Sequence, residues 1–419
     1  MTRFFTTGLS KINLLDVKRV AALVLVFNVC AGANAATHFG LSDTPSSEPA
    51  VADPALVSLG KQLFFDPRLS ANGTVSCATC HIPEQGFTQN QVPTSTGFDG
   101  RSLRRNSSTL LNIGYQTVLF HDGRESTLEN QVWSPLLSDR EMANPSVGWL
   151  LDRVAGLDDY DQQFQTLLGD LDMLTLGVAI AAYERTLIAA DSPFDRWFFN
   201  GDETAMPEDA IAGFAIFNRH GCTNCHLIEE HHARFEDAQF HNTGIGFSRS
   251  MLEYPDKTKS GPDNFAEIGA EARFGGEAIS DLGQSKTKAI SDLGRSKTKA
   301  ISDPGRSKTK AISDLGQIDK QANRDLGRFE VTGHQEDRWR YRTPTLRNIA
   351  LTSPYMHDGS LRNLDAVIAY YLAGGSKDPK QDPRLLPFTL TFDETQHLLA
   401  FLESLTGHHI DVLINSASE

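Results

Sequence analysis

Two short cysteine motifs constrain this chain more than any other feature of its sequence. Cys77-Ala78-Thr79-Cys80-His81 and Cys222-Thr223-Asn224-Cys225-His226 each place two thiols three positions apart, with a histidine directly after the second thiol. This is the attachment pattern of c-type haem, in which each thiol forms a thioether and the histidine binds the iron. The sequence therefore predicts two covalently bound haems, with His81 and His226 as iron ligands.

Two other interpretations of a cysteine pair fit less well. Structural zinc usually takes its four ligands from two neighbouring pairs, whereas these pairs lie far apart in the chain. A redox-active dithiol does not require a histidine after its second cysteine. We therefore retain c-type haem for both motifs.

The first 35 residues are typical of a secretory signal peptide. Basic residues precede the apolar run of residues 20–29, and Ala33-Asn34-Ala35 supplies a small-x-small cleavage site. The run is too short to span a bilayer, so we expect no transmembrane anchor in the mature chain. Cys30 lies where a lipid-modified cysteine stands in some exported proteins, but the residues before it match that signal poorly.

Composition limits the cellular compartments and the classes of partner that suit this chain. Without the leader, every remaining cysteine belongs to a haem motif, so none is left for a structural disulfide. Haem attachment outside the cytoplasm predicts a periplasmic location. The net charge of −14 argues against nucleic acid as a partner.

The two halves of the chain share further segments in the same order. Thr109-Leu110-Leu111-Asn112 resembles Thr345-Leu346-Arg347-Asn348, and His-Asp-Gly follows each of them, at His121 and at His357. Both pairs are separated by the same 236 positions, as from Thr109 to Thr345. We therefore predict an internal duplication of one haem-binding unit.

Apolar residues recur mainly at helical spacing. Helix-start signals at Asp53-Pro54 and Met206-Pro207-Glu208 precede the two motifs, and a capping box begins at Thr391. Another helix is predicted with one apolar face made of Leu171, Leu174, Val178, Ala181 and Ala182. Strand-like alternation is scarce. The prediction is a mainly α fold with two cytochrome c-like haem domains, residues 36–205 and 206–419.

An eleven-residue repeat interrupts the second half at residues 278–317. The unit that begins at Ala278 recurs from Ala289 and Ala300, with a partial copy from Ala311. This period is found in some coiled coils, but each copy contains a glycine and few apolar residues. A mobile, basic surface insertion is the preferred interpretation.

Together with the segment from Ser353 to Gly359, these features make the chain resemble the bacterial di-haem cytochrome c peroxidase family, and in particular its MauG-like branch, which includes MbnH-like proteins. The resemblance covers nearly all of residues 50–405 apart from the repeats. It implies that residues 36–205 form the peroxidatic domain, where hydrogen peroxide reacts. Residues 206–419 would form the electron-transfer domain.

The resemblance also implies an open site at the first haem. In family members that draw electrons from a cytochrome, a distal histidine covers this haem and leaves before peroxide binds. Here the matching segment from Pro93 to Gly97 leads to Phe98, which cannot bind iron. The first haem is then five-coordinate, with its open distal side at Phe98 and Pro135.

Two polar residues carry the proton chemistry that the resemblance implies. The family's distal glutamate and glutamine map onto Glu141 and Gln131. Glu141 would act as the general acid/base that moves a proton between the peroxide oxygens as their bond breaks. The alternative for Glu141 is an ordinary solvated glutamate, because glutamates are mostly surface residues.

The sixth ligand of the second haem separates the branches of the family. A methionine binds there in the cytochrome c peroxidases and raises the potential, whereas the MauG branch has a tyrosine. The family register places Tyr371 at this position. Met356 is the competing ligand, and Tyr370 is a neighbour that could be confused with Tyr371. The other alternative is that both tyrosines are core residues on one helix.

His121 departs from the family pattern. The family has a tryptophan between the haems as an electron relay, and His121 stands in its place before Asp122-Gly123. Histidine carries an electron hole less well than indole. An inter-haem relay, a hydrogen-bonding bridge, an iron ligand and a structural residue all remain open for His121.

The family also binds a calcium ion between its domains. Asn106, Thr352 and Pro354 match the positions of the asparagine side chain and the backbone carbonyls that hold it. Oxygen ligands suit this hard cation. The resemblance therefore implies Ca²⁺ as a further cofactor.

These assignments imply a periplasmic di-haem oxidoreductase. It would react with hydrogen peroxide to form high-valent haem iron and oxidise a residue of a partner protein, such as a tryptophan, at long range. One alternative is a cytochrome c peroxidase that reduces peroxide with electrons from a small cytochrome. Another alternative is a non-catalytic di-haem electron carrier.

Overall fold

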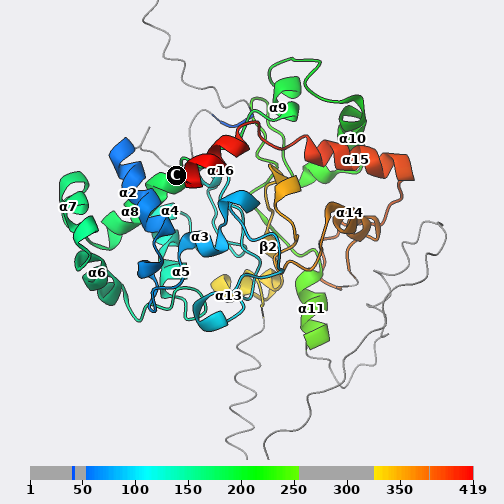
Figure 1. Cartoon of the computed structure of the whole chain (residues 1–419). Helices are drawn as coiled ribbons and strands as arrows, with labels where there is room; N and C mark the ends of the chain where they lie inside the picture. The colour runs from blue at the N-terminus through cyan, green and yellow to red at the C-terminus, as the bar shows by residue number, and fades with distance from the viewer. Residues whose placement is uncertain (1–39, 43–52, 254–324, 377, 419) are drawn as a thin grey trace, which may run out of the picture.

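The computed structural model describes residues 40–42, 53–253, 325–376 and 378–418 (Figure 1). The predicted signal peptide and the repeats at 278–317 lie outside the described residues. Within them, no helix combines the length and the apolar character that a membrane crossing needs.

The described part of the chain is mainly helical, as predicted, and contains little sheet. The α-helices are α2 (Pro54–Phe65), α3 (Cys77–Cys80), α4 (Leu128–Gln131), α5 (Trp133–Leu137), α6 (Val147–Ala155), α7 (Asp158–Leu167), α8 (Met173–Glu184), α9 (Pro193–Phe198), α10 (Glu208–Arg219), α11 (Ile245–Glu253), α13 (Phe329–Thr332), α14 (Leu364–Leu372), α15 (Phe392–Glu403) and α16 (Ile410–Ser418). The strands β1 (Phe240–His241) and β2 (Tyr341–Arg342) pair in antiparallel fashion. Short 3-10 turns connect many of these elements.

The first core forms where α2 crosses α8. Asp53 caps α2 as predicted, because its carboxylate accepts a hydrogen bond of 2.8 Å from the Ala55 N–H. The helices approach so closely that a Cβ atom at Gly60 would lie 1.9 Å from the Ala179 carbonyl oxygen. This close contact needs glycine and fixes the position of α2 against α8.

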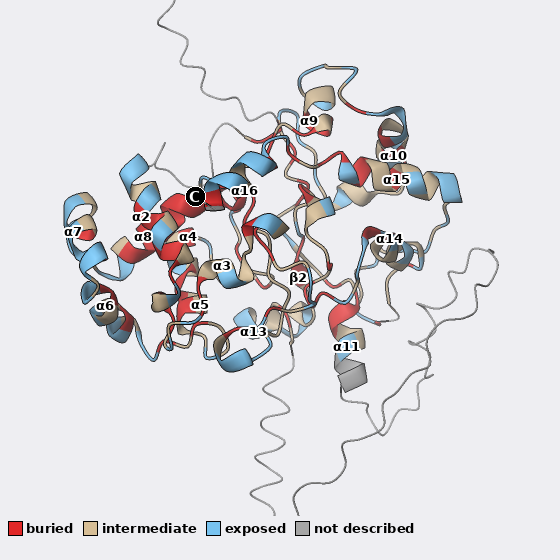
Figure 2. Cartoon of the chain, in the orientation of Figure 1, coloured by how far each residue is buried: buried red, intermediate tan, exposed pale blue. Residues whose placement is uncertain are grey.

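The predicted apolar face of α8 is partly wrong. Leu174 is 64% exposed, whereas Leu176, Ala179 and Ile180 are fully buried. Figure 2 shows α8 buried along most of its length. The helix packs against both α2 and α4, so no single apolar stripe marks its buried side.

The second core repeats this arrangement with α10 and α15. Both helices occur where the sequence predicts them, and Thr391 forms the predicted capping box with Glu394. A Cβ atom at Gly213 of α10 would lie 1.9 Å from the His397 carbonyl oxygen of α15. The Phe217 and Phe401 rings, 4.9 Å apart between centroids, fill the contact.

Two helices, α9 and α16, pack in the core of the half that does not contain them in the sequence. Phe194 of α9 is buried in the second core, although it precedes residue 206. Ile410 and Ala417 of α16 are buried in the first core, although they lie at the end of the chain. Each half therefore contributes one helix to the core of the other half.

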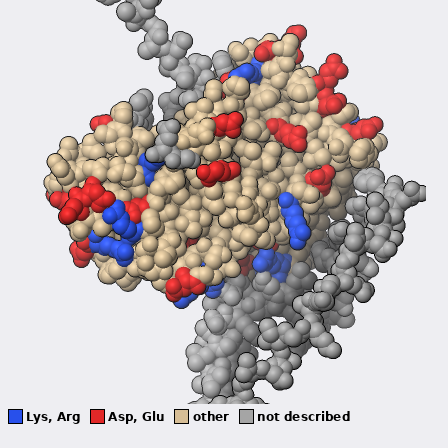
Figure 3. Space-filling model, in the orientation of Figure 1, with Lys and Arg blue, Asp and Glu red and all other residues tan. Residues whose placement is uncertain are grey.

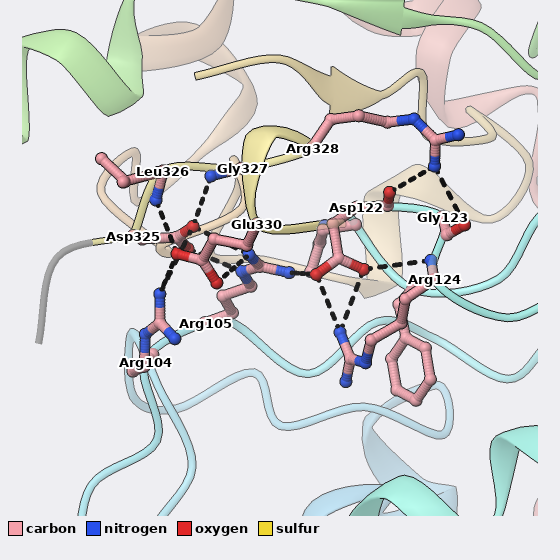
Figure 4. Close-up of polar contacts among 12 residues, drawn as sticks. Arg104, Arg105, Asp122, Gly123, Arg124, Asp325, Leu326, Gly327, Arg328 and Glu330 are labelled. Carbon is pink, nitrogen blue, oxygen red and sulfur yellow. Dashed lines mark hydrogen bonds and ion pairs between the residues drawn. The ribbon is translucent and has the colours of Figure 1, made fainter. Parts of the chain in front are cut away.

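A network of arginines and carboxylates joins the halves (Figure 4). Arg105 contacts Asp122 at 2.7 Å within the first half and Asp325 at 2.6 Å in the second. Arg328 donates to the carbonyl oxygens of Asp122 at 2.8 Å and of Gly123 at 3.0 Å. These contacts hold the His121-Asp122-Gly123 turn against residues 325–328.

The surface agrees with the negative net charge of the sequence. Figure 3 shows acidic side chains in small groups over the face in view, and no broad basic patch on that face.

Candidate functional site

The first haem motif is a short helix followed by its histidine. The Thr79 hydroxyl accepts a hydrogen bond of 3.0 Å from the Ser76 N–H at the start of α3. His81 follows the helix, and its Nδ1 lies 3.2 Å from the Phe87 carbonyl oxygen. A carbonyl can only accept, so Nδ1 carries the proton and Nε2 keeps a lone pair. The ring is thus oriented as a metal-binding imidazole.

A pocket brings most of the predicted first-site residues together. Its walls include Cys77, Cys80, His81, Gln131, Pro135 and Glu141. The space between these residues is about 510 Å³ when the open space at the mouth is included. Two thiols, an imidazole with a free Nε2 and apolar neighbours such as Val75 and Ile180 form a donor set that fits a covalently held haem.

Glu141 is a desolvated carboxyl in this pocket. Burial raises its pKa above the ordinary value, against the opposing effects of Arg124 and of a hydrogen bond with Ser138. Such a group can hold a proton at a higher pH than a surface glutamate does. The solvated alternative does not match this environment.

Phe98 lies next to Glu141 and is not among the pocket-lining residues. The Phe98 N–H donates to the Glu141 carbonyl oxygen at 2.9 Å and to the Arg140 carbonyl oxygen at 3.0 Å. Phe98 therefore adjoins the backbone that carries the proposed acid.

Sequence reasoning missed Glu184, another carboxyl that lines the pocket. It ends α8, is only 4% exposed, and its Oε2 has no hydrogen-bond partner in the described structure. The available signal was an acidic residue directly after the apolar run of residues 176–183. The apolar spacing of that run predicts a helix but gives no information about the residue at its end.

The histidine of the second haem motif has a partner of the same kind as the histidine of the first. Cys222–Asn224 form a 3-10 turn, and the His226 Nδ1 lies 2.8 Å from the Phe235 carbonyl oxygen. The Nε2 atom of His226 therefore also keeps its lone pair. Both histidines are oriented by a backbone carbonyl a few residues further along the chain.

Tyr371 on α14 lies near the second motif. Burial raises the pKa of its phenol, and the thiols of Cys222 and Cys225 add to the effect. Tyr370 is engaged elsewhere, because its hydroxyl donates to the Thr243 carbonyl oxygen at 2.6 Å. Met356 has the positive φ of 73° and precedes His357 in a turn.

His121 lies partly buried between the halves as a hydrogen-bonded, neutral ring. Its Nε2 lies 3.0 Å from the Asn106 carbonyl oxygen and 3.3 Å from the Ser108 hydroxyl. Burial and the nearby Arg105 guanidinium lower its pKa to about 3. The backbone carbonyl of His121 accepts from the Arg342 N–H of β2 at 2.7 Å.

The candidate calcium residues come from two adjoining segments. The Asn106 N–H donates to the His357 carbonyl oxygen at 2.8 Å, which places Asn106 beside the segment containing Thr352 and Pro354. The Asn106 amide nitrogen donates to the Pro93 carbonyl oxygen at 3.0 Å. The Thr352 hydroxyl donates to the Ile349 carbonyl oxygen at 3.2 Å.

A histidine and two carboxylates form a group beside Cys225 of the second motif. His241 of β1 lies 2.8 Å from Asp237 and 2.9 Å from Asp382. The Cys225 thiol lies within 4.8 Å of the Asp237 and His241 ligand atoms. Because Cys225 belongs to the haem motif, we assign no separate metal ion to this group.

Comparison with known proteins places this geometry among di-haem enzymes. Residues 54–204 match the family model described as di-haem cytochrome c peroxidase. The methylamine utilization protein MauG of Methylorubrum extorquens is 31% identical over 356 residues, which cover 84% of this chain and 78% of MauG. The cytochrome-c peroxidase IdrP1 of Denitromonas iodatirespirans is 32% identical over 368 residues, which cover 86% of this chain and 84% of IdrP1.

A solved structure agrees with the sequence relatives. The crystal structure of a MauG-like protein associated with microbial copper homeostasis aligns with a TM-score of 0.61 and 25% sequence identity. The alignment covers 88% of this chain and 96% of that protein.

Proposed function

The chain belongs to the di-haem cytochrome c peroxidase family, and on that premise we propose that it reacts with hydrogen peroxide and oxidises a tryptophan of a partner protein. Its relatives are named as MauG and as cytochrome-c peroxidases, and the chain is a di-haem oxidoreductase. The similarity to MauG and to a MauG-like structure supports the MauG-like branch. The export signal supports a periplasmic location.

The residues of both motifs fit covalent c-type haem. Cys77 and Cys80 would hold one porphyrin and Cys222 and Cys225 the other, with His81 and His226 as proximal ligands. When bound, the haems supply the redox chemistry by taking up the oxidising equivalents of peroxide and passing them to a donor. The protein chain supplies binding, orientation and proton transfer.

Glu141 is the group that we propose to move the proton of the bound peroxide. Its carboxyl takes a proton from one peroxide oxygen and delivers it to the other, which makes the departing oxygen leave as water. Gln131 can donate a hydrogen bond from its amide and orient the peroxide. Pro135 and Met142 line the same pocket and limit the entry of water. Phe98 leaves the distal side without a competing protein ligand.

The single observation that carries the MauG-like assignment is the place of Tyr371. Tyr371 lies on α14, where burial raises the pKa of its phenol and Tyr370, Cys222 and Cys225 have smaller effects in the same direction. Tyr370 donates to a backbone carbonyl instead. A tyrosinate ligand favours the oxidised metal, which suits a centre that stores oxidising equivalents for a distant protein residue.

The most direct test adds hydrogen peroxide to the fully oxidised protein without a reductant. A MauG-like protein reacts at once and holds its oxidising equivalents until a donor arrives. A protein that reacts only after one haem is reduced is the alternative, a cytochrome c peroxidase fed by a small cytochrome. That alternative is favoured by the cytochrome-c peroxidases among the relatives.

The resting spectrum tests the non-catalytic alternative. One five-coordinate, high-spin haem beside one low-spin haem supports an open peroxide site. Two low-spin haems would instead favour an electron carrier.

We also propose that the two haem units, residues 36–205 and 206–419, arose by duplication. Asn112 and Asn348 both adopt a positive φ, of 62° and 60°. The Asn112 amide oxygen accepts from the Ala189 N–H, and the Asn348 amide oxygen accepts from the Gly407 N–H, both at 2.8 Å. Equal bonds at equivalent positions support a shared origin.

Calcium and the role of His121 complete the proposal. Asn106, Thr352 and Pro354 would bind Ca²⁺ at the junction of the halves, where it would stabilise their contact. The bond between His121 and the Asn106 carbonyl oxygen supports His121 as a hydrogen-bonding bridge at this junction. Loss of one calcium per protein after chelation, measured by elemental analysis, tests the ion site.

A further inference from the structure

Glu184 is a buried carboxyl that the proposed mechanism does not use. It lines the same pocket as Glu141 and is 4% exposed. Its Oε2 atom is buried and has no hydrogen-bond partner within the described residues. A buried polar atom without a partner is costly and calls for an explanation.

Glu184 and Glu141 lie close to the same thiol. Both carboxyls raise the pKa of Cys77, in addition to the larger effect of burial on that thiol. Burial also raises the pKa of Glu184 itself, to about 8, with Arg185 and Glu129 acting on it in opposite directions. At neutral pH the Glu184 carboxyl therefore carries a proton that it can release into the pocket.

A partly exposed ion pair lies beside Glu184. Arg185 forms an ion pair of 2.6 Å with Glu129 of α4, and their side chains are 11% and 20% exposed. The pair is held in place because α4 packs tightly on α8, where a Cβ atom at Gly177 would lie 2.4 Å from the Glu129 carbonyl oxygen. Glu184 lines the pocket, and both members of this partly exposed pair lie close enough to act on the pKa of its carboxyl.

We propose that Glu184 is a second proton-carrying group of the first haem pocket, which takes protons from solvent at the Glu129–Arg185 pair and supplies them to the peroxide site. The inference rests on the proposed reaction with peroxide. Reduction of one hydrogen peroxide to two waters consumes two protons and two electrons. Glu141 only moves a proton from one oxygen to the other, so the consumed protons have to enter from outside.

Glu184 loses one proton to the pocket and regains one from solvent. Its O–H bond breaks when the proton passes into the pocket through water, and the carboxylate regains a proton from solvent on the Glu129 side. The carboxyl is unchanged after each cycle. The electrons come from the haems and finally from the oxidised donor, so Glu184 undergoes no redox change.

The test uses the holoprotein and the substitution Glu184→Gln, which keeps the shape of the side chain and removes the exchangeable acid. In the resting protein, infrared difference spectroscopy should show the C=O band of an un-ionised carboxylic acid that shifts in D₂O and is lost in Glu184→Gln. With peroxide, the variant should react about 10- to 100-fold more slowly. The decline of the wild-type rate above about pH 8 should be absent.

Control variants separate this role from a structural one. Glu184→Asp keeps an acid and should recover part of the rate, whereas the exposed Glu403→Gln should leave both the rate and the infrared band unchanged. A Glu184→Gln protein with full haem content and the wild-type rate would overturn the proposal, as would a wild-type protein without the band. The band is measured without peroxide, so failure of the proposed function is recognised separately.

Discussion

At the scale of single residues, the role that we propose for Glu141 is the easiest to isolate. Glu141→Gln keeps the size of the side chain and removes its acid. We expect the reaction with peroxide to slow by about 10²- to 10⁴-fold, the usual contribution of general acid–base catalysis, with unchanged haem content. Stopped-flow absorbance measures the rate. A variant that reacts as fast as the wild type would assign proton transfer to another group.

The proposed ligation by Tyr371 predicts that its replacement changes the redox potential of the second haem. Replacing a phenolate ligand by a thioether favours the reduced metal, so Tyr371→Met should raise the potential of the second haem. The variant should also hold its oxidising equivalents for a shorter time after peroxide is added. Spectroelectrochemical titration measures the potential, and Tyr370→Phe is the matched control. Equal shifts in both variants would contradict the assignment of Tyr371 as the ligand.

Glu184 predicts an unusual dependence of stability on pH. Its pKa is about 8 in the folded chain, against an ordinary value of 4.5. Between these values the folded state binds a proton that the unfolded state lacks, so rising pH lowers the free energy of unfolding. Glu184→Gln should therefore match the wild type near pH 4. At pH 9 it should be more stable, by on the order of a few kcal/mol.

Chemical denaturation at several pH values measures this difference. The gain in stability of Glu184→Gln should grow between about pH 4.5 and pH 8 and then level off. A difference that stays constant across this range would show that the carboxyl titrates normally.

At the scale of helices, the crossing of α10 and α15 depends on one glycine. The Cβ atom added by Gly213→Ala would lie 1.9 Å from the His397 carbonyl oxygen, so the helices have to separate. We expect a loss of about 1–3 kcal/mol, the usual cost of overpacking. Gly148→Ala in α6 is the matched control, because nothing lies within 4 Å of its added Cβ. That variant should be neutral or slightly stabilised.

The helices also show what the sequence could and could not predict. Local signals located α2, α10 and α15, because a capping residue and helical spacing lie within one segment. The buried side of α8 could not be located in this way, since contacts with α2 and α4 cover it on more than one side. The strands β1 and β2 contain two residues each and depend on a distant partner. No periodic pattern can form over that length.

The same distinction applies to the site. Cys77, Cys80 and His81 lie within five residues, so their spacing alone indicates the chemistry. Gln131, Pro135 and Glu141 required a family resemblance, because the fold and not the spacing brings them to the pocket. Glu184 comes from a different helix, and only its burial distinguishes it from an ordinary helix-end glutamate.

At the scale of the whole molecule, the C-terminal helix stabilises the first half. Ile410 and Ala417 of α16 are buried in the first core, and the Lys61 ammonium donates to the Ser416 carbonyl oxygen at 2.5 Å. A chain that stops after Gly407 should therefore expose apolar surface of the first core. We expect a loss of about 2–5 kcal/mol, as for other truncations of buried side chains, measured by chemical denaturation.

The half of the protein that unfolds first in the truncated chain tests this prediction. Spectral changes should appear first at the haem of His81, because α16 belongs to its core. If the spectrum of the haem of His226 changes first, α16 supports the second half instead.

The arginine that joins the halves has a consequence for the speed of charge movement. Arg105 holds Asp122 and Asp325 at the same time, so this guanidinium is one of the contacts that fix the separation between the two metal-binding units. Tunnelling slows steeply as the gap between donor and acceptor widens. A change that breaks the ion pairs of Arg105 would therefore slow electron transfer inside the protein, while each metal centre kept its own ligands.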